Sequence, residues 1–209
     1  METQWLVAGQ SGAIEQAADL LKQGLVVAFP TDTLYGIGAD PFNLAAIEKL
    51  FAVKNRPQEK GIPILLADLE DLDKVAQEIP PIAQSLIQQY WPGALTLVVP
   101  KHPRLPSIIS SNEGIAVRIP DHEVSRAFIR AAGGAVAATS ANRSGEQPAQ
   151  DATEAFEAMN GLIAAVLDGG PVQHGQGSTV LDCMSDPPKV LREGPIAVKK
   201  QGLGIDETS

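Results

Sequence analysis

The apolar residues of this chain come in short runs, most of which end at turns rich in Gly, Pro or hydroxyl residues. Such a run is long enough for a strand buried on both faces and too short for a core helix. The 19 Gly and 16 Pro among 209 residues also favour many tight connections over long bundled helices. Amphipathic stretches with helical spacing lie between the runs. The alternation predicts an α/β fold.

Eight strands and five helices are expected from this alternation. The strands are predicted over residues 25–29, 62–66, 94–99, 115–119, 135–138, 163–167, 179–182 and 190–192. The helices are predicted to start after Ser11 and at Asn43, both candidate N-caps, and to cover residues 81–90, 123–132 and 152–159. Successive helices and successive strands exclude a purely parallel sheet. We expect a twisted mixed open sheet with flanking helices in one domain, residues 1–200, followed by a short tail, residues 201–209.

Charge and cysteine content exclude several classes of protein. The 25 acidic and 16 basic residues give a net charge of −9, which disfavours a general nucleic-acid coat or a polybasic membrane binder. Cys183 is the single cysteine, which excludes a disulfide framework and a Cys-rich metal site. No export signal is visible, and the uncharged stretch 79–100 contains four prolines and three glutamines that lipid would not tolerate. We therefore expect a soluble, cytoplasmic protein without a membrane partner.

Several common catalytic patterns are missing. The sequence has no Gly-x-x-x-x-Gly-Lys-Ser/Thr loop, no Gly-x-Gly-x-x-Gly after the first strand and no Gly-x-Ser-x-Gly elbow. His102, His122 and His174 lack metal-ligand spacing and are expected on the surface or in loops. We predict no metal site made of protein ligands.

Three cations lie within seven residues after the second helix, in a chain that is otherwise acidic. They are Lys54, Arg56 and Lys60. Alternate residues of an extended segment point the same way, so Lys54 and Arg56 could converge on one anion such as a triphosphate. The alternative is a solvated helix end, with Lys54 stabilising the helix dipole.

Arg118 lies within an apolar strand. Strand alternation places Ala116 and Arg118 on one face and Ile115, Val117 and Ile119 on the other. An unpaired buried charge is costly, so Arg118 needs an anionic partner. That partner could be an internal Asp or Glu, or it could be an anionic ligand.

Polar residues also gather where other predicted strands begin or end. These segments cover residues 30–38, 139–145, 175–180 and 191–195. Open α/β sheets bind ligands at such edges, and Gly36 and Gly38 would let the backbone approach a ligand closely. Taken singly, each segment could equally be a capped turn or an Asx turn.

Together these segments resemble the threonylcarbamoyl-AMP synthases of the YrdC/Sua5 type. The matching motifs, in the order of that family, are PTDTLYGIG (30–38), KNRPQEKG (54–61), WPGALT (91–96), AVRIP (116–120), TSANRSG (139–145), GSTV (177–180) and LREGP (191–195). Each is weak alone, but together they cover nearly the whole chain. Relatives of uncertain activity tend to lose the Lys-x-Arg and Ser-x-Asn patterns, and both are present here.

The resemblance implies a fold and a reaction. The fold is a twisted open sheet around a concave cavity, in the short single-domain form. The reaction joins L-threonine, bicarbonate or CO₂, and ATP into threonylcarbamoyl-AMP and pyrophosphate. A downstream threonylcarbamoyl transferase complex then uses the product to modify adenosine 37 of tRNA. Mg²⁺ would be bound through the ATP phosphates.

The resemblance also implies roles for individual residues. Threonine would be held by Thr33, Arg118, Ser140 and Ser178, with Arg118 facing its carboxylate. ATP would be held by Lys54, Arg56, Lys60, Asn142 and Arg192, with Lys54 and Arg56 also catalytic. No obvious general base is present in the motifs, so catalysis would rest on positioning and charge neutralisation.

A competing function is a double-stranded RNA- or tRNA-binding module without catalysis. A concave cationic surface can hold RNA through its phosphates, although the net charge of −9 weighs against this. A carbamoyl- or acyl-phosphate hydrolase accessory fits less well, because no nucleophile is visible.

Overall fold

The computed structural model describes residues 2–197, and the predicted tail, residues 201–209, lies outside them. The strands are β1 (Gln4–Val7), β2 (Val27–Phe29), β3 (Gly36–Ala39), β4 (Ile64–Leu66), β5 (Leu95–Pro100), β6 (Gly114–Arg118), β7 (Ala135–Ser140), β8 (Ala165–Asp168), β9 (Thr179–Asp182) and β10 (Lys189–Arg192). The α-helices are α1 (Ala13–Lys22), α2 (Leu44–Lys54), α3 (Pro81–Tyr90), α4 (Glu123–Ala131) and α5 (Ala152–Met159). Short 3₁₀ helices cover Gln58–Lys60, Leu69–Lys74 and Ser107–Ile109.

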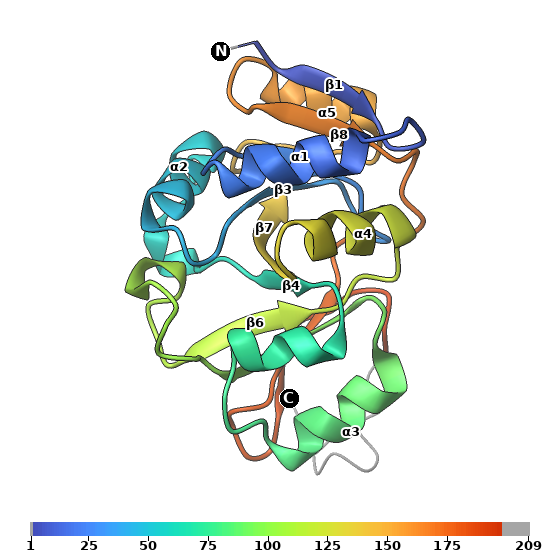
Figure 1. The fold of residues 1–209 in the computed structure, drawn as a ribbon. Helices are drawn as coiled ribbons and strands as arrows, with labels where there is room; N and C mark the ends of the chain where they lie inside the picture. Colours follow the sequence, from blue (N-terminus) through green and yellow to red (C-terminus); the bar gives the residue numbers. More distant parts are fainter. Residues whose placement is uncertain (1, 198–209) are drawn as a thin grey trace.

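All ten strands of the described residues form one sheet, in the order β1-β8-β2-β3-β7-β4-β6-β5-β9-β10. The pairs β1–β8, β2–β8, β4–β6 and β5–β9 are parallel, and the other neighbours are antiparallel. The expectation of a mixed open sheet with flanking helices is thus confirmed (Figure 1).

Helices cover the two faces of the sheet unequally. On one face α1 and α4 pack side by side, and their buried residues join Phe29, Val136 and Leu167 in one core cluster (Figure 1). On the opposite face α2, α3 and α5 pack against a larger cluster. The cluster under α1 and α4 includes no residue of β5, β6 or β9, so this part of their face is left without a helix.

The predicted helices and strands are present, most of them with slightly shifted ends. The five helices and eight strands predicted from the apolar pattern are all found, and Asn43 caps α2 by accepting a hydrogen bond from the backbone N–H of Ala46 at 3.2 Å. The predicted Ser11 cap is wrong. Gly12, in the left-handed conformation, occupies the N-cap of α1, and no side chain caps it.

Two strands were not predicted. β1 contains the short apolar run of residues 5–7, which was not assigned to a strand, and only Leu6 of this run is buried. β3 has the sequence GIGA, and glycine is depleted in strands. A Cβ on Gly38 would lie 2.5 Å from Val136 Cγ1 and 2.9 Å from Phe29 Cε1. Gly38 therefore makes room for side chains of neighbouring strands, which corrects its expected role in approaching a ligand.

Within residues 2–197, no helix combines the length and the apolar character needed to cross a membrane.

Candidate functional site

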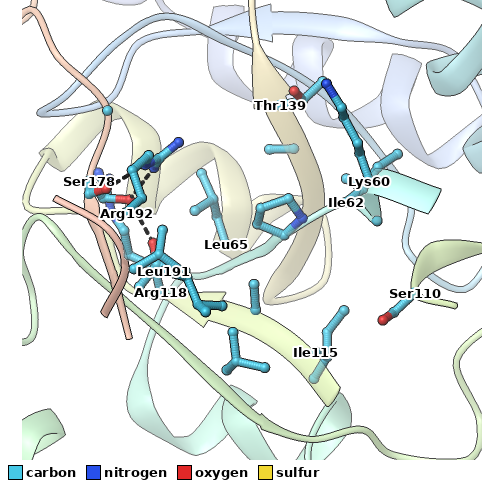
Figure 2. A pocket seen from close by; sticks show the side chains of 18 of the residues that line it. Lys60, Ile62, Leu65, Ser110, Ile115, Arg118, Thr139, Ser178, Leu191 and Arg192 are labelled. Carbon is cyan, nitrogen blue, oxygen red and sulfur yellow. Dashed lines mark hydrogen bonds between the residues drawn. The ribbon is translucent and has the colours of Figure 1, made fainter. Parts of the chain in front are cut away.

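A cavity of about 830 Å³ opens on the part of the sheet that α1 and α4 leave uncovered (Figure 2). Its floor consists of alternate strand residues, among them Thr96 and Val98 of β5, Ala116 and Arg118 of β6, and Val180 and Asp182 of β9. The intervening residue Val117 belongs to the core on the other side, and Ile115 contributes to that core as well as to the cavity (Figure 2). The predicted alternation in the Arg118 strand is confirmed, and it directs polar groups into the cavity.

The cavity brings together seven of the nine residues predicted for substrate binding. They are Thr33, Arg56, Lys60, Arg118, Ser140, Ser178 and Arg192. Lys54 and Asn142 do not line it, but lie behind its wall, where they contact Ser140. The polar segments at the strand ends thus meet at one place, although they are far apart in the sequence.

Lys54 ties helix α2 to the end of β7. Its Nζ donates hydrogen bonds to the Ser140 carbonyl oxygen at 2.7 Å, to Ser140 Oγ at 3.0 Å and to Asn142 Oδ1. Burial and the neighbouring charge of Arg56 lower the pKa of Lys54 to about 8. Both groups that Lys54 holds belong to the predicted Ser-x-Asn motif.

The expected geometry of the Lys-x-Arg pair is wrong. Lys54 is the last residue of α2, and Asn55 has a left-handed backbone (φ 51°), so the segment is not extended. Arg56 instead donates from Nε to the Gly61 carbonyl at 3.0 Å and from a terminal nitrogen to the Lys60 carbonyl at 2.6 Å. Arg56 therefore lines the cavity while Lys54 supports its wall.

Asn142 uses both ends of its amide to hold the loop after β7. Its Oδ1 accepts from Lys54 and from Ser140 Oγ, the latter at 2.6 Å. Its Nδ2 donates to the Arg143 carbonyl at 2.9 Å and to the Glu146 carbonyl at 2.6 Å. Because Asn142 is also buried, it shapes the rim at Ser140 in this structure.

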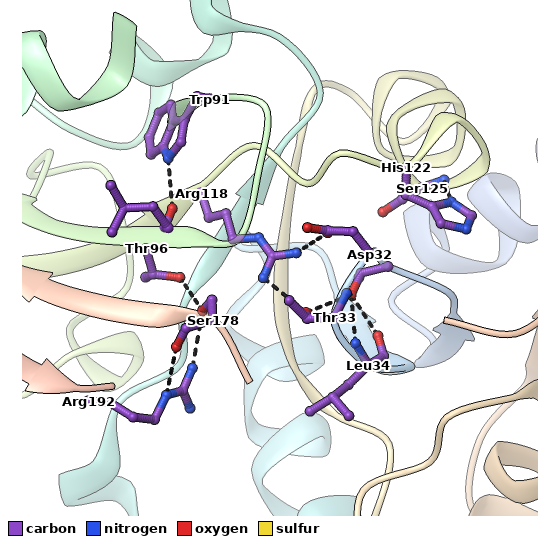
Figure 3. A network of polar contacts seen from close by, with 12 residues as sticks. Asp32, Thr33, Leu34, Trp91, Thr96, Arg118, His122, Ser125, Ser178 and Arg192 are labelled. Carbon is purple, nitrogen blue, oxygen red and sulfur yellow. Dashed lines mark hydrogen bonds and ion pairs between the residues drawn. The ribbon is translucent and has the colours of Figure 1, made fainter. Parts of the chain in front are cut away.

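Arg118 has an internal anionic partner, Asp32 (Figure 3). One terminal nitrogen of its guanidinium donates to Asp32 Oδ1 and the other to Thr33 Oγ1 at 3.0 Å. Burial lowers the pKa of Arg118, while Asp32 acts in the opposite direction. Of the two partners that the sequence left open for Arg118, the structure thus shows the internal carboxylate, Asp32.

Asp32 is the residue that sequence reasoning missed at this site. It is fully buried in the turn after β2, and one of its carboxylate oxygens, Oδ2, has no hydrogen-bond partner. The available signal was a charged residue between two threonines, in the turn that follows a strand that is apolar throughout. Such a carboxylate needs a cation, and Arg118 is the strand cation that needs an anion.

Ser178 and Arg192 form a second polar group in the cavity (Figure 3). Ser178 Oγ shares a hydrogen bond with Thr96 Oγ1 at 2.7 Å. Arg192 donates from Nε to the Ser178 carbonyl at 2.9 Å and from a terminal nitrogen to Ser178 Oγ at 3.1 Å. These contacts fix Arg192 of β10 against the loop that precedes β9.

Glycine permits this contact between the two segments. A Cβ on Gly194 would lie 2.4 Å from the backbone nitrogen of Thr179 and 2.5 Å from the Gly177 carbonyl oxygen. Real Cβ atoms do not approach backbone so closely, so any side chain here would push the two segments apart. Gly194 thus holds the Leu191–Pro195 motif near Ser178.

The charge of the cavity suits an anion better than a metal ion. Arg192 lies near enough to Arg56 and to Arg118 to help lower the pKa of each, after the larger effect of burial. Among the described residues, no three His, Cys, Asp or Glu side chains are grouped to hold a metal ion. His122 accepts a hydrogen bond from the Ser125 N–H at 3.3 Å as the cap of α4, and His174 is exposed in a loop.

Known proteins resemble this chain over most of its length. The threonylcarbamoyl-AMP synthase of Bacillus subtilis is 41% identical over 185 residues, which are 88% of this chain and 54% of that protein. A Mycobacterium tuberculosis relative is 36% identical over 203 residues, which are 96% of this chain and 93% of that protein. This chain therefore spans about half the length of the Bacillus relative and nearly all of the Mycobacterium one.

A solved structure and a family model agree with these relatives. The crystal structure of Pyrococcus abyssi Sua5 complexed with L-threonine matches with a TM-score of 0.88 and 36% identity, covering 93% of this chain and 58% of that chain. Residues 19–194 match the family model of Sua5, YciO and YrdC, whose description is "Telomere recombination". This chain belongs to the Sua5/YciO/YrdC family.

Proposed function

We propose that this protein is an L-threonylcarbamoyladenylate synthase, which makes threonylcarbamoyl-AMP and pyrophosphate from L-threonine, bicarbonate or CO₂, and ATP. The observation that carries the proposal is the single cavity in which hydroxyl groups and three guanidiniums from distant segments converge. Two neighbouring substrates, one an amino acid and one a polyanion, require such a combination. The L-threonine in the Pyrococcus abyssi Sua5 crystal structure supports the choice of amino acid.

Threonine would bind at the end of the cavity lined by Thr33, Arg118 and Ser178. The hydroxyls of Thr33 and Ser178 can each donate or accept a hydrogen bond. The Arg118 guanidinium, held by Asp32 and Thr33, offers positive charge to the threonine carboxylate. Ser140, the last residue of β7, would complete the threonine end of the cavity.

ATP would bind beside threonine, with its phosphates near Arg56, Lys60 and Arg192. All three line the cavity, and two of them are arginines, which bind phosphate oxygens in a bidentate manner. Lys54 and Asn142 would not contact the nucleotide in this arrangement. They would support its site, because they hold Ser140 and the loop that follows it.

The reaction would proceed in two balanced steps. The threonine amine combines with bicarbonate to form a carbamate and water. A carbamate oxygen then attacks the α-phosphorus of ATP, and the bond to the β-phosphate oxygen breaks as pyrophosphate leaves. Holding both reactants in one cavity can contribute roughly 7–11 kcal/mol to lowering the barrier. The arginines at the phosphate end would stabilise the charge that develops on the leaving pyrophosphate.

Mg²⁺ fits this site only as an ion carried by the nucleotide. The cavity carboxylates Glu59, Glu113 and Asp182 do not form a cluster that could hold a metal, so phosphate oxygens and water would be its ligands. Bound there, Mg²⁺ would neutralise phosphate charge. Arg56 and Arg192 would orient the same phosphates from the protein side.

The direct test is to incubate the protein with ATP, Mg²⁺, bicarbonate and a panel of amino acids, and to measure pyrophosphate release. The proposal expects release only when threonine and bicarbonate are both present. Pyrophosphate release that is independent of threonine, or none at all, would overturn the proposal. Supply of the product to a threonylcarbamoyl transferase complex for tRNA modification belongs to the same proposal.

The Arg56→Ala variant tests the phosphate end. We expect kcat/KM for ATP to fall at least about 100-fold, equivalent to about 2.7 kcal/mol, because a half-buried guanidinium facing the phosphates is lost. Arg104→Ala is the matched control, since Arg104 is an exposed cation over the Phe42 ring and does not line the cavity. Equal activity of both variants would show that Arg56 is not needed.

The RNA-binding alternative is less well supported. Arg56, Arg118 and Arg192 point into a cavity of about 830 Å³ that suits small molecules, and Arg118 is buried. RNA affinity that falls steeply with salt, in a protein without synthase activity, would favour that alternative instead.

A further inference from the structure

We propose that Asp32 is a positioning residue for the amino-acid substrate. It orients the Arg118 guanidinium and offsets its charge, so that this end of the cavity receives a zwitterion and excludes a second anion. The inference rests on the proposed synthase function and assigns a role to a residue that does not itself line the cavity.

The contacts of Arg118 determine its direction. Asp32 Oδ1 accepts from one terminal nitrogen and Thr33 Oγ1 accepts from the other, so both ends of the guanidinium are held (Figure 3). Thr33 is in turn fixed by Thr31, whose Oγ1 lies 3.0 Å from Thr33 Oγ1 and donates to the Leu34 carbonyl at 2.7 Å. The turn after β2 therefore acts as one rigid unit that orients Arg118.

The charges around Arg118 explain why a carboxylate is needed there. Arg118 is 3% exposed, and Arg192 is its cationic neighbour in the cavity. Without Asp32, the charge of Arg118 would add to that of Arg192, and the Arg118 end of the cavity would also attract phosphate groups. With Asp32, the Asp32–Arg118 pair is neutral, and the excess positive charge lies toward Arg56 and Arg192. The two substrates would thereby be sorted to different ends of one cavity.

Unused hydrogen-bonding capacity indicates that the pair is more than a structural ion pair. Asp32 Oδ2 and Arg118 Nε are both buried and have no partner. Buried polar atoms are normally satisfied, so an unpaired acceptor and an unpaired donor within one ion pair are unusual. An α-amino acid carries both an ammonium group and a carboxylate and is neutral overall, so it suits an end of the cavity where the Arg118 charge is offset by Asp32. Thr31 and Thr33, on either side of Asp32 in the sequence, both line the cavity.

The Asp32→Asn variant tests the inference, because it keeps the shape of the side chain and removes its charge. We expect the KM for threonine to rise at least tenfold, the KM for ATP to stay within twofold, and the inhibition constant of pyrophosphate against threonine to fall about tenfold. A purely structural role would lower the amount of active enzyme without changing these constants separately. The control is Asp68→Asn, whose carboxylate pairs with Arg126 and Arg130 outside the cavity. We expect it to leave all three constants unchanged.

A measurement on the wild-type protein keeps the inference testable if Asp32→Asn does not fold. 3-Hydroxybutanoate resembles threonine without its ammonium group. The proposal predicts that its inhibition constant against threonine is at least ten times the KM for threonine. Competition as strong as threonine binding would overturn the inference.

The outcomes separate this inference from the proposed function. If the wild-type protein makes threonylcarbamoyl-AMP while Asp32→Asn keeps the wild-type KM for threonine, the inference is wrong and the function stands. If the wild-type protein releases no pyrophosphate with threonine, the proposed function is wrong and the inference falls with it.

Discussion

The cationic side chains at the cavity have very different surroundings. Lys54 and Arg118 are buried, Arg56 is half-buried, and Lys60 and Arg192 are exposed. Burial disfavours a charged group, so each buried cation must be held by acceptors. Lys54 is held by Ser140 and Asn142, and Arg118 by Asp32 and Thr33. Arg192, although exposed, is held by its hydrogen bonds to Ser178.

Lys54 should make the free energy of unfolding depend on pH. Its pKa is about 8 in the folded protein, against an ordinary value of 10.5. Between these values the unfolded chain binds more protons, so stability rises with pH. We expect the wild type to gain up to about 3 kcal/mol over Lys54→Met between pH 7 and 10.5, measured by urea denaturation. Other groups titrate in both proteins and cancel in the comparison. A constant difference across this range would contradict the lowered pKa.

Helix α2 delivers Lys54 to the site, and both of its ends are defined by asparagines. Asn43 caps its first turn with a side-chain oxygen, and Asn55 ends it in the left-handed region, φ 51° and ψ 47°. Only glycine and, at some cost, asparagine or aspartate adopt this conformation readily. The backbone turn at Asn55 is also what separates the directions of Lys54 and Arg56.

Substitutions at Asn55 should therefore separate a backbone effect from a side-chain effect. Asn55→Ala should lose about 1 kcal/mol of unfolding free energy, because an alanine Cβ is disfavoured at positive φ. Asn55→Gly should be within a few tenths of a kcal/mol of the wild type or more stable. Chemical denaturation of the two variants provides the measurement, and equal stability of Ala and Gly would contradict a left-handed cap.

The sequence predicted the central strands because their burial is visible in their own residues. Central strands such as β2 and β4 are buried on both faces, so they appear as unbroken apolar runs. Strand β3 could not be found this way. Its Gly38 is needed because the side chains of Phe29 and Val136, which belong to other strands, occupy the space of a Cβ. The N-cap of α1 was misplaced because Ser11 has a capping side chain that the structure does not use, while Gly12 adopts a left-handed backbone.

At the scale of the whole molecule, the cavity depends on contacts that no local pattern shows. The motifs indicated which segments carry ligand groups, and seven of the nine named residues do line one cavity. An acidic partner for Arg118 could be expected, but its identity as Asp32 was not evident, because the two residues are 86 positions apart in the sequence. Nor was the placement of Lys54 and Asn142 behind the wall, which depends on how α2 meets the end of β7.

The segment that carries Arg192 forms one wall of the cavity, and its position can be tested at Gly194. In Gly194→Ala the new Cβ would collide with the backbone of Gly177, Ser178 and Thr179, so the segment that carries Arg192 must move. We expect a loss of at least tenfold in ATP affinity, measured by titration calorimetry, with an unchanged circular dichroism spectrum. Gly9→Ala is the control, since nothing lies within 4 Å of the added Cβ there. Wild-type affinity in Gly194→Ala would show that this close approach is unnecessary.

The order of strands in the sheet bears on how the protein emerges from the ribosome. β1 pairs only with β8, and β10 only with β9, so the strand pairing at each edge of the sheet needs residues that are made late. A nascent chain can begin to assemble its early segments, as growing chains do. Its first strand has no neighbour until residues 165–168 leave the exit tunnel, and its cavity lacks a wall until Arg192 follows. A chain that has not yet been translated as far as Arg192 therefore has no complete pocket for substrates.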